Sequence, residues 1–130
     1  MAGGAVTVAA CGPDVLAAMF AGRATRAQFV AVGGWFFEAF KGDSSSGGFW
    51  VIPRPAGAEL HTELKLRGTD AIAAAEILKR ILANDFGVSR LTGYVLNENR
   101  AAKIFAAKIG FRRVAVDDAK TYYEQWLQTK

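Results

Sequence analysis

Apolar and polar positions form short, changing patterns along the first half of this chain, with glycine and proline turns between them. The small apolar run at 5–10 predicts a first strand, and apolar residues at helical spacing over 15–20, just after Pro13, predict a short helix. The polar segment 43–48 is expected to form a mobile hairpin tip. Three aromatic and β-branched runs predict an antiparallel meander, over 29–32, 35–40 and 49–52.

The second half of the chain has clearer periods. Residues 58–66 alternate from one face to the other, which predicts a strand with two distinct faces. A turn at 67–70 follows, and apolar residues three and four apart then predict a helix over 71–86. One face of the predicted strand carries Glu59, His61 and Glu63, and the other carries Leu60, Thr62, Leu64 and Leu66.

The segment 90–114 predicts a strand, a capped helix and a second strand in one run. Alternation indicates the first strand over 90–96. Asn97 or Asn99 can then accept a hydrogen bond from the free N–H groups that begin a helix. Gly110 can take the left-handed conformation that ends this helix.

These patterns predict an α/β protein with a mixed sheet in the order β-α-β-β-β-α-β-α-β-β, closed by a strand over 121–127. With 130 residues, of which 52% are hydrophobic, the chain is expected to form one domain, 1–130. The lone Cys11 cannot make an internal disulfide, which favours a reducing, cytoplasmic location and excludes a cysteine metal cluster. No metal site is expected. No run approaches the ~18 apolar residues that span a bilayer, so no membrane span is expected either.

The chain carries a net charge of +4, and its basic residues cluster between 100 and 113 without an acidic one. Three interpretations are open: solvated faces of a helix and a strand, a site for cofactor phosphates, or a nucleic-acid surface. Nucleic acid is not favoured, because the chain has no paired Cys/His ligands and no aromatic-basic signature of an RNA-binding sheet. The cluster consists of Arg100, Lys103, Lys108, Arg112 and Arg113.

The strand-helix-strand run resembles the C-terminal half of the GNAT acetyltransferase superfamily, through Asn99, Ala102, Phe105, Gly110 and Phe111. The resemblance covers nearly the whole predicted order and implies the GNAT fold. It also implies an N-acyltransferase that uses acetyl-CoA, or another acyl-CoA, and transfers the acyl group directly to a small-molecule or peptide amine. The run ELHTELKLRG is in addition similar to a strand of short phage-encoded GNAT-like proteins.

In GNAT proteins, backbone N–H groups at the start of the helix after the central strand hold the cofactor pyrophosphate, which here points to residues 67–73. Laid from Arg67, the family pattern puts Asp70 and Ile72 where glycines are expected, and a shift by one residue puts Ala71 and Ala73 there. Alternatively, Thr69 or Asp70 only caps the helix. The implied cofactor-binding residues are Leu66, Arg67, Gly68, Thr69, Ala71, Ile72, Asn99, Arg100, Ala102 and Lys103, with Arg100 and Lys103 at the 3′-phosphate or simply solvated.

Acyl transfer to an amine needs a base for the incoming ammonium and is helped by an acid for the departing thiolate. Glu59, His61 and Glu63 share one strand face and are the candidate catalytic residues, and His61 is the only histidine. The resemblance implies that they lie at a cleft where the strands 58–66 and 90–96 splay apart. The acid is missing at the expected place, because Ala106 stands where many GNAT enzymes have tyrosine. The other candidate phenols are Tyr94, Tyr122 and Tyr123.

The alternative hypothesis is a catalytically silent GNAT-fold protein that binds a ligand or builds a structure, for example in a phage particle. The departures at Asp70, Ile72 and Ala106 favour it. A homodimer that pairs through the aromatic-rich final strand is a further expectation.

Overall fold

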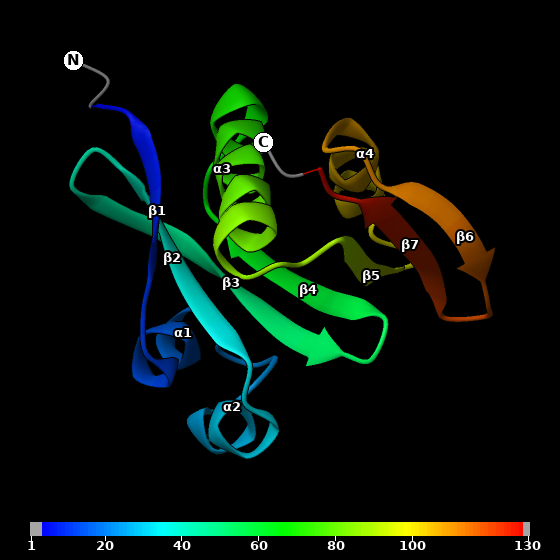
Figure 1. The fold of residues 1–130 in the computed structure, drawn as a ribbon, viewed down its shortest axis with the longest axis horizontal. Coiled ribbons are helices and arrows are strands. Elements are labelled where there is room, and N and C mark those ends of the chain that lie inside the picture. Colours follow the sequence, from blue (N-terminus) through cyan, green and yellow to red (C-terminus); the bar gives the residue numbers. More distant parts are fainter. Residues whose placement is uncertain (1–3, 129–130) are drawn as a thin grey trace.

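The computed structural model describes residues 4–128, in which one seven-stranded sheet is covered by helices on both faces (Figure 1). The strand order is β1-β2-β3-β4-β5-β7-β6. The strands are β1 Val6–Ala10, β2 Trp35–Lys41, β3 Ser44–Arg54, β4 Gly57–Leu64, β5 Arg90–Leu96, β6 Arg112–Val116 and β7 Lys120–Trp126. The helices are α1 Pro13–Met19, α2 Arg26–Val32, α3 Gly68–Asp85 and α4 Arg100–Lys108.

Two apolar layers hold the sheet between its helices. On one face, Phe37, Phe49 and Val51 pack with Leu78 and Leu82 of α3. On the other face, α1 and α2 form a second cluster around Trp50 and Ile52 of β3. α3 and α4 lie on one side of the sheet and α1 and α2 on the other (Figure 1). Alternation along the strands therefore decides which helices each side chain meets.

The helix α2 corrects the sequence-based expectation, which assigned residues 29–32 to the meander. Thr25 accepts a hydrogen bond from the Gln28 backbone N–H at 3.2 Å, and the Gln28 side chain accepts one from the Thr25 N–H at 2.8 Å. This capping box begins a helix, and Phe29 is then fully buried, with its ring centroid 4.5 Å from that of Trp50. Tertiary burial of one aromatic side chain outweighs the strand preference of the short run.

The expectation of a mobile hairpin tip over 43–48 is also wrong. The turn is formed by residues 42–43 alone, and Ser44 already pairs with Lys41 as part of β3. Gly47 and Gly48 are buried in the strand. A Cβ at Gly47 would lie 2.2 Å from the Glu63 carbonyl oxygen, so β4 can approach only because the residue is glycine.

The expected splaying of the central strands is present. All neighbouring strands are antiparallel except β4 and β5, and these pair only at Ala58 with Leu91 and at Glu59 with Thr92. Beyond that point they separate toward their carboxyl ends. β4 leads into α3 and β5 leads into α4, so both helix N-termini lie at the opening. This is the edge at which α/β sheets bind ligands.

The C-terminal half otherwise follows the sequence. The Asn99 side chain accepts the Ala102 N–H at 3.1 Å and caps α4, and Gly110 has a φ of 98° after its end. β7, however, lies between β5 and β6 and has no free edge, so it cannot pair edge to edge with a second copy as expected, and the homodimer itself stays a prediction. Among residues 4–128, no helix has the length and apolar character needed to cross a membrane.

Candidate active site

A cleft of about 720 Å³ occupies the opening between β4 and β5. His61 and Tyr94 line it from the sheet face of α1 and α2, whereas Leu60 and Val95 line it from the opposite face. Because the strands are apart here, the cleft passes through the sheet and joins its two sides. It also reaches the first turns of α3 and α4.

Most of the residues that the resemblance implied for the cofactor line this cleft, but three do not. Those at the cleft are Leu66, Arg67, Gly68, Ala71, Ile72, Asn99 and Ala102. Thr69, Arg100 and Lys103 are not among its lining residues, although Arg100 and Lys103 lie on the first turns of α4 beside it. Lys108, at the end of α4, does line the cleft.

The N-terminus of α3 faces the cleft without a side-chain cap. Arg67 is the N-cap residue and makes no capping hydrogen bond, so the expectation that Thr69 or Asp70 caps this helix is wrong. The first N–H groups of a helix have no partner within it and carry its positive end. Gly68 has a φ of 54°, and a Cβ added there would meet nothing within 4 Å. The N–H groups of Asp70 and Ala71 donate to the Arg67 carbonyl oxygen, which leaves those of Gly68 and Thr69 as the donors at this helix end, and such donors suit an anionic group.

The acidic residue in this turn points away from the cleft. Asp70 accepts a hydrogen bond from Lys41 Nζ of β2 at 2.8 Å and is not among the lining residues. Its negative charge is thereby paired on the far side of the helix. The departure from the family pattern at Asp70 is consequently no obstacle to an anion at the N-terminus, whereas Ile72 remains in the cleft wall.

His61 and Glu59 form a hydrogen-bonded pair next to the cleft. His61 Nε2 lies 2.5 Å from Glu59 Oε2, and Arg54 Nη2 donates to Glu59 Oε1 at 3.0 Å. The His61 ring packs between those of Trp50 and Tyr94, at centroid distances of 5.5 and 5.6 Å. An ionised carboxylate only accepts, so His61 donates through Nε2 and its Nδ1 lone pair is the basic one.

Electrostatics keep the imidazole neutral and the carboxylate charged. Burial lowers the pKa of His61 below its ordinary value, and the hydrogen bond and charge of Glu59 only partly oppose this. Burial raises the pKa of Glu59, but the hydrogen bonds and charges of Arg54 and His61 together outweigh it and leave this pKa below its ordinary value. The pair is thus an unprotonated base held by an ionised carboxylate.

Glu63 is separate from this pair. Its carboxylate forms an ion pair with Arg23, which also donates to the Thr62 carbonyl at 3.0 Å. Arg23 comes from the loop between α1 and α2 and lines the cleft, yet it stands in a polar stretch that gave no functional signal. Only the folded contact, forty residues apart in sequence, reveals it.

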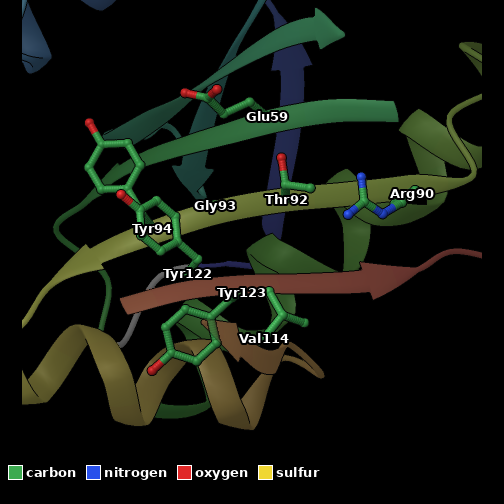
Figure 2. A pocket seen from close by; sticks show the side chains of 8 residues that line it. All are labelled: Glu59, Arg90, Thr92, Gly93, Tyr94, Val114, Tyr122 and Tyr123. Carbon is green, nitrogen blue, oxygen red and sulfur yellow. The ribbon is translucent and has the colours of Figure 1, made fainter. Parts of the chain in front are cut away.

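The tyrosines divide into free and engaged phenols. Ala106 is buried and lines the cleft together with Tyr94 and Tyr123. Tyr122 instead donates its hydroxyl to Asp117 Oδ2 at 2.8 Å. Figure 2 shows Tyr122 and Tyr123 pointing to opposite sides of the sheet. Tyr94 and Tyr123 are therefore the phenols that adjoin the cleft.

A smaller hollow of about 240 Å³ adjoins the cleft and shares Gly93, Tyr94 and Tyr123 with it. Glu59, Arg90 and Thr92 complete much of its lining (Figure 2). The His61–Glu59 pair therefore lies between two spaces, with His61 at the cleft and Glu59 at the hollow. Within residues 4–128, no group of three or more His, Cys, Asp or Glu side chains is placed to hold a metal ion.

No protein-family model matches the chain, and no curated protein matches its sequence. Solved structures do match it, and the three described here are acetyltransferases. The ribosomal-protein-S18-alanine N-acetyltransferase of Escherichia coli has a TM-score of 0.74 at 17% identity, over 96% of each chain. An acetyltransferase of Thermus thermophilus has a TM-score of 0.69 at 23% identity, over 98% of this chain and 100% of that one.

A third match is a complex. The Campylobacter jejuni N-acetyltransferase PseH with acetyl coenzyme A has a TM-score of 0.69 at 17% identity, over 93% of this chain and 98% of that one. Such matches extend over nearly the whole of both chains. The chain therefore has the GNAT fold, as the resemblance predicted.

Proposed function

We propose that this protein is an acyl-CoA-dependent N-acyltransferase that passes an acyl group, in the simplest case acetyl from acetyl-CoA, directly to a substrate amine. One observation carries the proposal: the cleft between β4 and β5 connects the uncapped N-terminus of α3 with the His61–Glu59 pair. The fold is shared with a structure solved with acetyl coenzyme A, which supports the same ligand here.

The residues at the cleft fit such a cofactor. The N–H groups of Gly68 and Thr69 at the start of α3 would hold the diphosphate, because α3 has no side-chain cap and the Asp70 carboxylate is paired with Lys41. Leu66 and Phe105 would flank the apolar arm. Arg100 and Lys103 lie just outside the cleft, where a 3′-phosphate that extends beyond it would meet them.

The catalytic base in this proposal is His61. The bound thioester supplies an activated acyl group with a thiolate as leaving group. His61 Nδ1 would take a proton from the incoming ammonium, directly or through one water, and Glu59 would hold the ring and stabilise the imidazolium that forms. Glu63, paired with Arg23, would shape the wall of the cleft rather than move a proton. Tyr94 or Tyr123 would supply the proton to the thiolate, since Ala106 cannot.

The second candidate function is a GNAT-fold protein that binds without turnover. The observation that favours it is Ala106, which leaves the cleft wall of α4 without a phenol. The hypotheses of a phage origin and a cytoplasmic location remain predictions from the sequence alone. Only the first candidate requires an acceptor amine, which is a small molecule or a peptide.

Calorimetric titration with acetyl-CoA, followed by an acetylation assay over a panel of small amines and peptides, separates the two. We expect saturable micromolar binding and turnover. We expect His61→Ala and the similarly sized His61→Gln each to lower kcat by about a hundredfold or more while changing cofactor affinity less than about threefold. Binding with no turnover on any amine would favour the silent protein. No heat at millimolar acetyl-CoA would show that the protein does not bind this ligand, and would contradict the proposed transferase.

A further inference from the structure

The small hollow beside the base has two ends of opposite character. Glu59, hydrogen-bonded to His61, lies at one end, and the guanidinium of Arg90 lies at the other. Thr92 and Tyr94 lie between and beside them on the same strand (Figure 2). A molecule in the hollow therefore meets an ionised carboxylate and a fixed cation at the same time.

Arg90 is held in position by its neighbours. Its Nε and Nη2 donate to Glu124 Oε1 at 3.0 and 2.8 Å, and its guanidinium carbon lies 5.9 Å from the ring centroid of Trp126. The side chain is only 27% exposed. A guanidinium fixed in this way binds an anion with little further loss of side-chain entropy.

Arg90 keeps both charge and donors for a ligand. The Glu124 carboxylate is shared, since its Oε2 accepts a hydrogen bond from Arg112 at 2.8 Å. Two guanidiniums on one carboxylate leave one positive charge in excess. Arg90 also has five N–H donors, and only those of Nε and Nη2 are directed at Glu124.

The distance between the two ends sets the size of the ligand. Thr92 is the register partner of Glu59, and Arg90 precedes Thr92 by two residues on the same face of β5. At about 3.3 Å per residue, the backbone positions that carry the two ends are about 7 Å apart along the strand. A chain of three or four atoms between an amine and an anionic group spans such a gap.

We propose that the small hollow binds the acceptor substrate, and that this substrate is a small amine carrying an anionic group, a carboxylate or a phosphate, bound by Arg90. The inference rests on the proposed function for the identity of the reacting group. The ammonium group lies near the Glu59 carboxylate, and the amine meets His61 and the acyl donor where the hollow joins the cleft, at Gly93 and Tyr94. Arg90 is then a specificity-determining residue.

The test compares matched amines with and without the anion. The pairs are 4-aminobutyrate with butylamine and 3-aminopropyl phosphate with propylamine, titrated into the cofactor-free protein and followed by NMR of backbone amides. We expect the anionic member of at least one pair to bind about tenfold more tightly or better, as charge-assisted hydrogen bonds allow. Preference within the carboxylate pair or the phosphate pair identifies the anion. Equal binding within both pairs overturns the inference.

Variants of Arg90 test whether this residue causes the preference for anionic amines. Arg90→Gln should reduce the preference to less than about threefold, and Arg90→Lys, which keeps the charge but loses the fixed guanidinium, should retain part of it. Arg80→Gln is the matched control, because it removes the same charge from an exposed position on α3 and should leave the preference intact. A preference that survives Arg90→Gln, or that falls equally in Arg90→Lys, contradicts the role of this cation.

Failure here and failure of the proposed function are distinguishable. The amine pairs are compared without cofactor, whereas acetyl-CoA is titrated separately. Acetyl-CoA binding and turnover of neutral and anionic amines at equal kcat/KM would leave the transferase standing and remove the anion-selective hollow. Selective binding of anionic amines without any acetyl-CoA binding would support the anion-selective hollow and contradict the proposed transferase.

Discussion

His61 and Glu59 stand two positions apart on β4, where side chains on one face are about 7 Å apart at their Cβ atoms. Their reacting atoms are nevertheless 2.5 Å apart, because the two side chains lean together under Trp50 and Tyr94. The alternation in the sequence shows that they share a face. It does not show that Glu63, on the same face, is paired with Arg23 instead.

Glu59→Gln should shift the pH dependence of acyl transfer. His61 acts as a base only when unprotonated, so kcat/KM falls as pH drops through its pKa, which burial places below the ordinary value. Glu59 opposes this shift, so its neutralisation lowers the pKa of His61 further. The acidic limb should move to lower pH and the plateau should fall roughly tenfold, since a weaker base transfers the proton less well.

The measurement is kcat/KM against pH for the parent and Glu59→Gln with the same amine. A limb that stays in place, or moves to higher pH, shows that the titrating group is not His61 under the influence of Glu59.

At the scale of elements, the N-terminus of α3 depends on a strand far from it in sequence. Lys41 at the end of β2 holds the Asp70 carboxylate, and this contact keeps a negative charge out of the cleft. The sequence shows an acidic residue in the first turn, where it stabilises the helix dipole. It cannot show the cation that binds it, because the two lie twenty-nine positions apart.

Lys41→Met should weaken acetyl-CoA binding. The freed Asp70 carboxylate would then repel the diphosphate near the same helix end, and since both side chains are partly exposed we expect about a three- to fivefold rise in Kd at low salt. Calorimetry at two salt concentrations measures this change. In Asp70→Asn and in the double variant the affinity should match the parent or exceed it, and an unchanged Kd in Lys41→Met contradicts the screening role.

The helix α2 is an element that the sequence pattern predicted wrongly, as a strand over 29–32. Its capping box depends on Thr25, so Thr25→Ala should cost about 1 kcal/mol of unfolding free energy, measured by urea denaturation. Thr69→Ala is the matched control, because α3 has no side-chain cap, and it should change stability by less than about 0.5 kcal/mol. Equal losses in the two variants would show that the box contributes nothing.

At the scale of the whole molecule, the sheet is one continuous structure that opens only between β4 and β5. The two strands bordering the opening each lead into a helix whose N-terminus faces it. Ligand binding there should stabilise the folded chain as a whole, since the unfolded chain has no such cleft.

Acetyl-CoA at a hundred times its Kd should add about 2.7 kcal/mol to the unfolding free energy and raise Tm by roughly 10 °C for a chain of this size. Thermal unfolding followed by circular dichroism measures the shift. Acetyl-pantetheine, which lacks the diphosphate, should give a much smaller shift at the same concentration. Equal shifts with both ligands would mean that the α3 N-terminus is not where the cofactor is held.

Short-range patterns in the sequence by themselves determined several of the helices and strands of this protein and where they end. They placed the two-faced strand with Glu59 and His61, the Asn99-capped helix and the Gly110 stop, because periodicity, caps and glycine conformations depend on neighbours a few positions away. Most of the residues that the GNAT resemblance implied for the cofactor line the cleft, because the turn before α3 and the start of α4 both lie at it.

Only the tertiary structure decided the rest. The burial of Phe29 against Trp50, the interior position of β7 and the ion pairs of Glu63 and Asp70 all depend on residues distant in sequence. The same is true of the hollow between Glu59 and Arg90, which exists because β4, β5 and β7 meet there in one register. Packing on both faces of the sheet sets that register, and no local pattern contains it.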